Sequence, residues 1–302
     1  MKFRNISSAP DWQVLQWFDG LFYRDFLEEA VILPDVSPGG LIPNGVAAVV
    51  KPDWTDHFPF DKAIGDIGCG MSWAAIPGFD MKRLKESWNS LYSTLSSKTA
   101  LLGSGNHFID GCRGEGDRFV MVVHLGSRAS SAELKEFVYY RDYAGYLERA
   151  EKNHRDIWAN ISRALGVQVD PVFLPHDTVT VEDGKTILRK GVTCSPGGSP
   201  FFIASSFDDV LVTGVTKPAI SELFNSMSHG TGRLTSRSEA KLVPVDQDDL
   251  RKRIVIPKNL PDSSWKLESP AHYRRSEQVL DAVDRYIEIR EILNPMAYMG
   301  GF

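Results

Sequence analysis

Four of the seven histidines stand in short blocks of glycine and polar residues that could belong to one site. The blocks are Gly103-Ser-Gly-Asn-His107, His124-Leu-Gly-Ser-Arg128, Pro175-His-Asp177 and Ser228-His-Gly-Thr-Gly-Arg233. A fifth block, Gly65-Asp-Ile-Gly-Cys-Gly-Met71, adds the carboxylate of Asp66 and the thiol of Cys69. Imidazole, thiolate and carboxylate groups are the ligands of borderline transition metals such as Mn, Fe, Co and Zn. Because glycine lets the backbone approach a bound ion or phosphate closely, the pattern predicts a metal-dependent enzyme that acts on phosphates.

His229 is the candidate nucleophile. It is followed by Gly230 and Gly232 and by two arginines, Arg233 and Arg237, which is a setting poorly suited to core packing. An imidazole can attack phosphorus, and arginines can bind phosphoryl oxygens in a bidentate manner.

Two other motifs have a second interpretation of equal simplicity. Arg189 and Lys190 form a cationic pair that could hold RNA or nucleotide phosphates, or could be a solvated strand end. Asp66 and Cys69 could likewise be a turn-forming carboxylate beside a buried apolar cysteine. It is the number of such blocks in one chain that favours a site.

Hydrophobic periodicity predicts the elements that must position these residues. We expect helices over residues 11–30, 81–95, 132–165 and 273–293, the third closed by Gly166 as its C-cap. Strands are expected over 46–50, 118–124 and 210–214, with a hairpin over 179–189 that turns at Asp183-Gly184. Because helices and strands interleave irregularly, we expect one α+β domain over residues 1–302.

Composition narrows the class of protein. The chain has 302 residues, 42% of them hydrophobic and 24% charged, as is ordinary for a globular protein. A net charge of −5 gives no support for nucleic-acid binding but leaves room for a local basic patch. Three cysteines are too few and too odd in number for a disulfide framework, and no apolar run is long enough for a membrane helix or a secretory signal. We therefore expect a cytoplasmic protein that does not bind a membrane.

Taken in order, the blocks resemble the RtcB family of RNA-splicing ligases. The matching pieces are Gly65–Met71, Leu102–Phe108, Val123–Arg128, Pro175–Asp177, Arg189–Thr193, Asn225–Arg233, Thr235–Ala240 and, more weakly, Glu268–Tyr273. The resemblance implies an α+β domain of mixed β-sheets flanked by helices. It also implies a ligase that uses GTP and Mn²⁺ to join an RNA end bearing a 2′,3′-cyclic phosphate or 3′-phosphate to an end bearing a 5′-hydroxyl.

The resemblance also implies roles for individual residues. His229 would become guanylylated, and two Mn²⁺ ions would be held, with Cys69 bridging, by Asp66, Cys69, His107, His124 and His176. The nucleotide pocket would contain Asn106, Asp110, Asp177, Ser206, Gly230, Thr231, Gly232 and Tyr273. RNA or nucleotide phosphates would meet Arg128, Arg189, Lys190, Arg233 and Arg237. An activating protein of the archease type is the implied partner besides RNA.

The chain departs from the family pattern mainly around the nucleotide. Gly300 stands where the family has a lysine, Asp110 replaces a glutamate and Asp177 an asparagine. Asp208 adds a further carboxylate, and Ser37 stands where the family has a histidine. Two alternatives therefore stay open: a metal-dependent phosphatase or cyclic phosphodiesterase acting on RNA ends, and a relative that has lost ligation.

Overall fold

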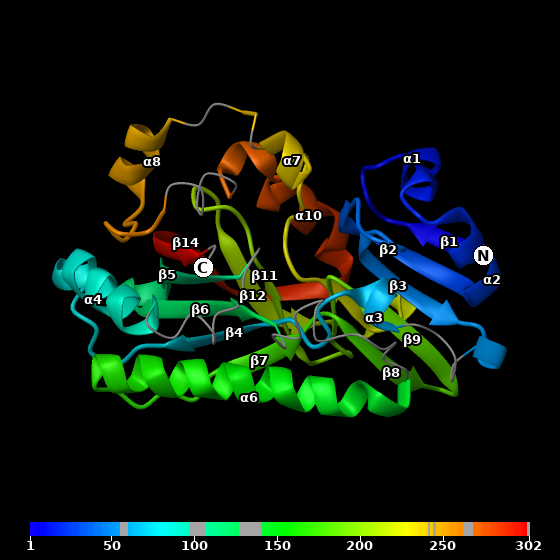
Figure 1. Ribbon diagram of the computed structural model, residues 1–302, viewed down its shortest axis with the longest axis horizontal. Coiled ribbons are helices and arrows are strands. Elements are labelled where there is room, and N and C mark those ends of the chain that lie inside the picture. The colour runs from blue at the N-terminus through cyan, green and yellow to red at the C-terminus, as the bar shows by residue number, and fades with distance from the viewer. Residues whose placement is uncertain are drawn as a thin grey trace.

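The computed structural model describes residues 1–54, 60–96, 107–126, 140–240, 242–243, 246–261 and 268–300 (Figure 1). The strands are β1 (Lys2–Asn5), β2 (Leu27–Ser37), β3 (Asn44–Val50), β4 (Gly70–Ala75), β5 (Phe108–Arg113), β6 (Phe119–Leu125), β7 (Val172–Pro175), β8 (Thr178–Glu182), β9 (Lys185–Lys190), β10 (Val192–Cys194), β11 (Pro200–Ile203), β12 (Leu211–Thr216), β13 (Ser226–Ser228) and β14 (Ile287–Gly300). The α-helices are α1 (Asp11–Gln16), α2 (Gly20–Phe26), α3 (Phe60–Ile64), α4 (Leu84–Ser96), α6 (Tyr140–Leu165), α7 (Arg237–Ala240), α8 (Gln247–Arg253) and α10 (Ser276–Val283).

Within these ranges the strands form three sheets. One has the order β1-β2-β3-β9-β8, a second the order β11-β12-β14-β5-β6-β4-β7, and the third pairs β10 with β13. The pair β1–β2 is parallel, whereas β2–β3, β4–β6 and β5–β6 are antiparallel. The predicted α+β fold of mixed sheets flanked by helices is confirmed.

Helices α4 and α6 cover one face of the seven-stranded sheet, and Figure 1 shows α6 running along its lower side. Trp88 and Leu91 of α4 and Ile157 of α6 pack in one cluster with Met121 and Val123 of β6. Val120 and Val122 of β6 pack in another cluster, with Phe202 and Leu211. Because side chains alternate along a strand, His124 lies on the face of the sheet away from α4 and α6.

Several predicted elements are confirmed. The strand at 46–50 is β3, the strand at 118–124 is β6, and the helix at 81–95 corresponds to α4 with a 3₁₀ turn before it. The hairpin of β8 and β9 turns at Asp183 and Gly184, whose φ angles of 48° and 75° suit a type I′ turn. Helix α6 ends before Gly166, which has a φ of 68°; residues 132–139 of the predicted helix lie outside the described ranges.

Two predicted helices are wrong in extent. The segment 11–30 forms the short helices α1 and α2, after which residues 27–37 belong to β2. The segment 273–293 is helical only over α10 and a 3₁₀ turn, and β14 begins at Ile287. This strand lies between β12 and β5, where Ile287 and Leu293 are buried by neighbouring strands. Sheet packing thus overrides a pattern that also fits a helical face. None of the described helices is long and apolar enough to cross a membrane.

Candidate active site

The predicted metal ligands are delivered by strand ends at one edge of the seven-stranded sheet. Cys69 directly precedes β4, His107 directly precedes β5, and His176 directly follows β7. His124 lies near the end of β6, where the antiparallel register places it opposite both Met71 and Phe108. Register alone therefore brings these four side chains to the same place.

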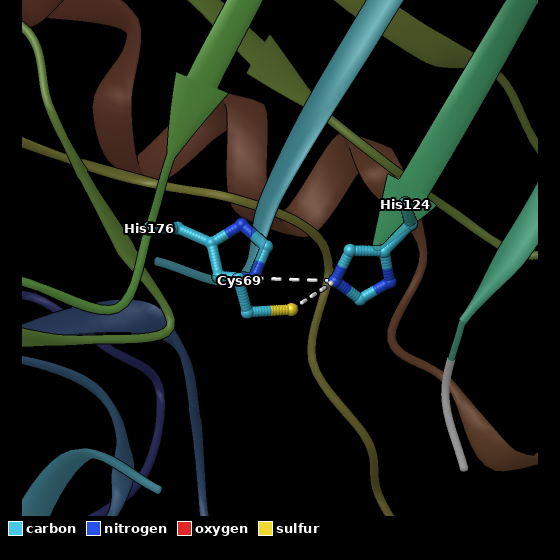
Figure 2. A group of neighbouring side chains, drawn as sticks. All are labelled: Cys69, His124 and His176. Carbon is cyan, nitrogen blue, oxygen red and sulfur yellow. Dashed lines mark hydrogen bonds between the residues drawn. The ribbon is translucent and has the colours of Figure 1, made fainter. Parts of the chain in front are cut away.

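Their donor atoms converge at short distances, and Figure 2 shows three of the four side chains, those of Cys69, His124 and His176. The Sγ atom of Cys69 lies 3.2 Å from Nε2 of His124 and 3.7 Å from Nε2 of His107. Nε2 of His124 lies 3.2 Å from Nε2 of His176, and Nε2 of His107 lies 3.5 Å from a carboxylate oxygen of Asp66. Among the described residues these form two groups with donor atoms within 4.8 Å, namely Cys69-His124-His176 and Asp66-Cys69-His107. Cys69 belongs to both, as a bridging thiolate between two ions would.

The chemistry of this cluster fits a metal centre. Burial raises the pKa of the Cys69 thiol well above its usual range, and the charges of Asp66 and Asp177 raise it further. Only a cation can hold such a buried thiol as the thiolate that binds metals. Burial also lowers the pKa of His176, which favours the neutral imidazole that serves as a ligand. The donor set of sulfur, nitrogen and oxygen suits a borderline transition metal.

His229 lies beside this cluster. It follows β13, and its ring centroid is 4.3 Å from that of His176 and 6.3 Å from that of His124. Nδ1 of His229 lies 2.5 Å from the carbonyl oxygen of Gly191 and 3.1 Å from Oδ2 of Asp35. A carbonyl can only accept, so in the neutral imidazole Nδ1 carries the proton and Nε2 keeps a lone pair for attack on phosphorus.

Sequence reasoning missed Asp35, which orients the candidate nucleophile. Its carboxylate accepts a hydrogen bond from Ser228 at 2.7 Å and is 1% exposed within the buried strand β2. Burial lowers the pKa of His229, but the hydrogen bond and charge of Asp35, with smaller contributions from Asp177 and Gly191, outweigh it and raise the pKa. The signal in the sequence was a carboxylate inside an apolar run, Ala30-Val-Ile-Leu-Pro-Asp-Val36, because a buried charge needs a partner.

A cavity of about 470 Å³ opens over the cluster and His229. Seven predicted nucleotide-pocket residues line it: Asp110, Asp177, Ser206, Gly230, Thr231, Gly232 and Tyr273. The eighth, Asn106, lies outside the described residues. Within the described part of the chain, Oδ1 of Asp110 and Oγ1 of Thr231 are buried and have no hydrogen-bond partner. Such atoms are costly unless a ligand satisfies them, which fits a polar ligand in this cavity.

Two carboxyl groups of the cavity have perturbed acidity. Burial, and secondarily the charge of Glu268, raises the pKa of Asp110 well above its usual range. Burial raises the pKa of Asp177 to about 7, although the N–H of Gly191 donates to it at 2.6 Å. Both shifts reduce the negative charge that the cavity would present to phosphates near neutral pH.

The predicted phosphate-binding cations have different settings. Arg233 lines the cavity and donates to the hydroxyl of Tyr273 at 2.8 Å and to Glu268 at 3.3 Å. Lys190 is buried and donates to the carbonyl of Ile42 at 3.1 Å. Arg128 and the side chain of Arg237 lie outside what the structure describes.

Arg189 contradicts its predicted role. Its side chain is fully buried and makes a 2.6 Å ion pair with Glu182. It also donates to the side chains of Ser226 and Thr180 and to the carbonyl of Phe224. The guanidinium nitrogens of Arg189 already donate to buried acceptors, and they could bind RNA phosphates only by giving up these hydrogen bonds. We therefore correct this prediction to a structural role beneath β13.

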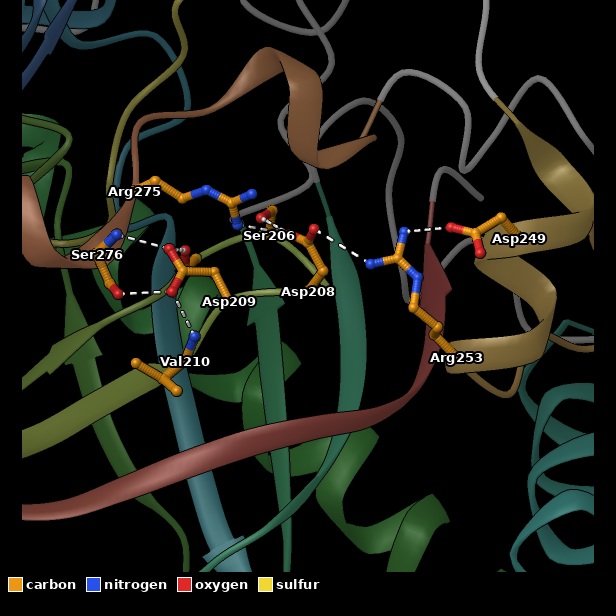
Figure 3. A network of polar contacts seen from close by, with 9 residues as sticks. Ser206, Asp208, Asp209, Val210, Asp249, Arg253, Arg275 and Ser276 are labelled. Atoms are coloured by element: carbon orange, nitrogen blue, oxygen red, sulfur yellow. Dashed lines mark hydrogen bonds and ion pairs between the residues drawn. The ribbon is translucent and has the colours of Figure 1, made fainter.

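The described residues that line the cavity do not include Asp208, whose carboxylate lies between two arginines (Figure 3). Its carboxylate pairs with Arg253 at 3.3 Å and with Arg275 at 3.1 Å, and it accepts a hydrogen bond from Ser206 at 3.2 Å. The further carboxylate noted in the sequence is thus paired with two arginines that are distant from it in the sequence.

Gly300 lies against Phe108 and Tyr298, two aromatic residues that line the cavity. It pairs with Phe108 in the β14–β5 ladder. A Cβ added at this position would collide with the hydroxyl of Tyr298 and approach Cβ of Phe108 to 2.8 Å. The packing around this residue therefore leaves no room for a side chain such as lysine.

Comparison with known proteins agrees with this geometry. The profile of the family described as tRNA-splicing ligase RtcB matches residues 144–301, which include His176 and His229. The chain belongs to the RtcB family. Asp66, Cys69 and His124 precede the matched segment, and the fold brings them to the same cavity as the RtcB residues His176 and His229.

Two curated relatives carry related names. RNA-splicing ligase RtcB of Escherichia coli strain K12 and RNA-splicing ligase RtcB1 of Escherichia coli strain ATCC 25922 are each 24% identical to the chain over 250 residues. Each alignment covers 66% of this chain and 60% of the relative, so the chain spans 60% of the length of these ligases.

Proposed function

We propose that this chain is a GTP- and Mn²⁺-dependent RNA ligase. It would join an RNA end bearing a 2′,3′-cyclic phosphate or 3′-phosphate to an RNA end bearing a 5′-hydroxyl. Membership of the RtcB family and the names of its relatives support ligation of RNA. GTP, Mn²⁺ and the covalent histidine are the finer parts of the proposal.

The observation that carries the proposal is the placement of His229. Its ring lies 4.3 Å from that of His176, a member of the Cys69-centred cluster, and Nδ1 is engaged by Asp35 and Gly191. A nucleophilic nitrogen is therefore fixed beside the ions that would face the same phosphate. A histidine with a purely structural role in the core would not be expected to line a cavity of about 470 Å³, as His229 does.

In the proposed first step, Nε2 of His229 attacks the α-phosphorus of GTP. The Nε2–P bond forms as the bond between the α-phosphorus and its bridging oxygen breaks, and pyrophosphate leaves. A 2′,3′-cyclic phosphate would first be opened by water, which breaks the bond between phosphorus and the 2′-oxygen and gives the 3′-phosphate. The RNA 3′-phosphate then takes GMP from His229, and the 5′-hydroxyl attacks this activated phosphate, forms the phosphodiester bond and releases GMP. Bound Mn²⁺ would supply Lewis-acid stabilisation of charge on the phosphoryl oxygens.

The remaining cavity residues fit the nucleotide. Asp110 and Thr231 offer buried polar atoms that have no partner among the described residues, and Arg233 offers a cation at the cavity wall. Ser206 and Tyr273 complete the lining near them. We expect Arg233 and Lys190 to meet phosphates. A catalytic domain over residues 1–302 and an archease-like activating partner also remain predictions.

One observation favours a second candidate, hydrolysis of RNA-end phosphates without a nucleotide intermediate. The packing around Gly300 excludes the lysine that the family pattern would place against the nucleotide. If nucleotide binding has been lost, the same metal cluster would still suit attack by water on a phosphate or cyclic phosphate.

Intact mass spectrometry after incubation with Mn²⁺ and GTP distinguishes the two. We expect an adduct of the mass of GMP that is absent in His229→Ala, with metal content unchanged in that variant. An AMP adduct in a parallel incubation with ATP would keep the mechanism and change the nucleotide. No adduct with either nucleotide in metal-loaded protein, together with hydrolysis of a cyclic-phosphate RNA, would replace the ligase by the hydrolase.

A further inference from the structure

Helix α6 makes a set of buried hydrogen bonds to the strands that carry the metal ligands. Nδ2 of Asn153 donates to the carbonyl of Gly126 at 3.0 Å, and Nε2 of His154 donates to the carbonyl of Leu125 at 3.1 Å. Because Nε2 carries the proton, Nδ1 of His154 accepts from the hydroxyl of Ser72 at 2.7 Å. Trp158 donates to the same hydroxyl at 2.7 Å, which closes the set.

These hydrogen bonds fix the backbone next to the metal ligand His124. Leu125 and Gly126 follow the ligand His124, and α6 lies on the opposite face of the sheet from its imidazole. Asn153 and His154 are 5% and 3% exposed, so water cannot replace these partners. Burial lowers the pKa of His154 to about 4, and the ring therefore keeps this hydrogen-bonding arrangement at neutral pH.

Gly126 connects these hydrogen bonds to Asp66. A Cβ added to Gly126 would coincide with the carboxylate of Asp66, so the carboxylate rests against the bare backbone that Asn153 holds. The loop before Cys69 is supported by the same helix, because a Cβ added to Gly68 would lie 2.8 Å from Cβ of Ala150. Helix α6 thus contacts the loop that carries Asp66 and holds the backbone of Gly126, against which the Asp66 carboxylate rests.

We propose that Asn153 and His154 are positioning residues of the metal centre, which act through Leu125 and Gly126 to set the affinity of the ion held by Asp66, Cys69 and His107. The inference rests on the metal dependence proposed above. Asn153 should affect the ion held by Cys69, His124 and His176 less, because it holds Gly126, which lies against Asp66, and Asp66 is not among the ligands of that ion. Groups that orient ligands in this way typically change metal affinity by tenfold to about a hundredfold.

Metal titration with Mn²⁺ and with Co²⁺ tests the inference without any reaction. Calorimetry gives the affinity of each ion, and the thiolate-to-cobalt absorption reports whether Cys69 is a ligand. We expect Asn153→Ala to weaken one ion by about tenfold and to leave the other, and the thiolate signal, nearly unchanged. Gly126→Ala should weaken the same ion more strongly, because the new methyl group displaces the Asp66 carboxylate. The ion whose affinity falls in Asp66→Asn is the one held by Asp66, Cys69 and His107, and it should be the same ion that Asn153→Ala weakens.

Matched variants separate positioning from general stability. Asn160 lies on the same helix, and its amide donates to Asp156 and accepts from Arg163, so Asn160→Ala should leave both affinities unchanged. His154→Gln can still donate to Leu125 and should bind metal better than His154→Phe. A folded Asn153→Ala protein with both affinities intact would overturn the inference, whatever Gly126→Ala does. Absence of metal binding in the parent protein would instead overturn the proposed metal dependence.

Discussion

The two ends of the cavity are built in different ways. At the metal end, formed by Cys69, His124, His176 and His229, side chains leave the ends of paired strands and contact one another at distances that register imposes. The aromatic end is formed by Phe108, Phe207 and Tyr298, whose rings cluster with residues of α8 and the segment after it. The side chains of the metal end are placed by strand ends, whereas Phe207 of the aromatic end lies in the loop between β11 and β12 and packs against residues of the short helix α8. We therefore expect the chemistry to be determined at the first and the nucleotide to be chosen at the second.

The largest predicted effect is at the metal end, in Asp35→Asn. The amide keeps the shape of the side chain but removes the charge that stabilises a proton on Nδ1 of His229. Replacing the acid partner of a catalytic histidine costs about 10⁴-fold in other enzymes; here the carbonyl of Gly191 still holds Nδ1. We expect adduct formation with GTP to slow by roughly 10²- to 10³-fold.

The control for Asp35→Asn is its metal content, since Asp35 belongs to neither group of metal ligands. Adduct formation measured by intact mass over time should fall while both ions stay bound. A rate within about twofold of the parent would show that Gly191 alone orients the nucleophile, and would remove Asp35 from the mechanism.

At the aromatic end we predict an effect on stability, in Asp110→Asn. Burial raises the pKa of Asp110 in the folded state, so the folded protein binds this proton more tightly than the unfolded chain does. The resulting stability is fully present below the unfolded pKa of about 4 and is lost as pH rises through the folded pKa. Asparagine carries no such loss, so the variant should have the higher Tm at pH 8. Each kcal/mol gained in the free energy of unfolding corresponds to a rise in Tm of about 2–4 °C.

Thermal unfolding of both proteins at pH 5 and pH 8, without metal or nucleotide, measures this difference. We expect the advantage of Asp110→Asn to grow from pH 5 to pH 8. An equal difference in Tm at both pH values would mean that the carboxyl group of Asp110 is already charged in the folded protein at pH 5. The aromatic end would then accommodate a buried negative charge.

The contrast between the two ends also explains what the sequence could predict. Cys69 and His124 were found because ligand chemistry needs those residue types near glycines, and β6 was found because Phe119–Val123 is an uninterrupted apolar run. The partner of His229 was missed because Asp35 comes from β2, whose proximity to β13 exists only after the sheets pack. The two arginines around Asp208 were invisible for the same reason, and β14 was taken for a helix because its burial depends on β12 and β5.

The smallest predicted effect concerns how α8 is held at the aromatic end, and Arg253→Gln tests it. Arg253 pairs with Asp208 at 3.3 Å and with Asp249 at 2.7 Å, but its side chain is 46% exposed. Exposed ion pairs contribute about 0–1 kcal/mol, and Asp208 keeps Arg275 in the variant. The free energy of unfolding in urea should fall by less than about 1 kcal/mol, and by less still in high salt, because Leu250 and Ile254 pack α8 against Phe207 and Tyr298. A larger loss that salt abolishes would mean that charge, and not apolar packing, holds α8 at the aromatic end.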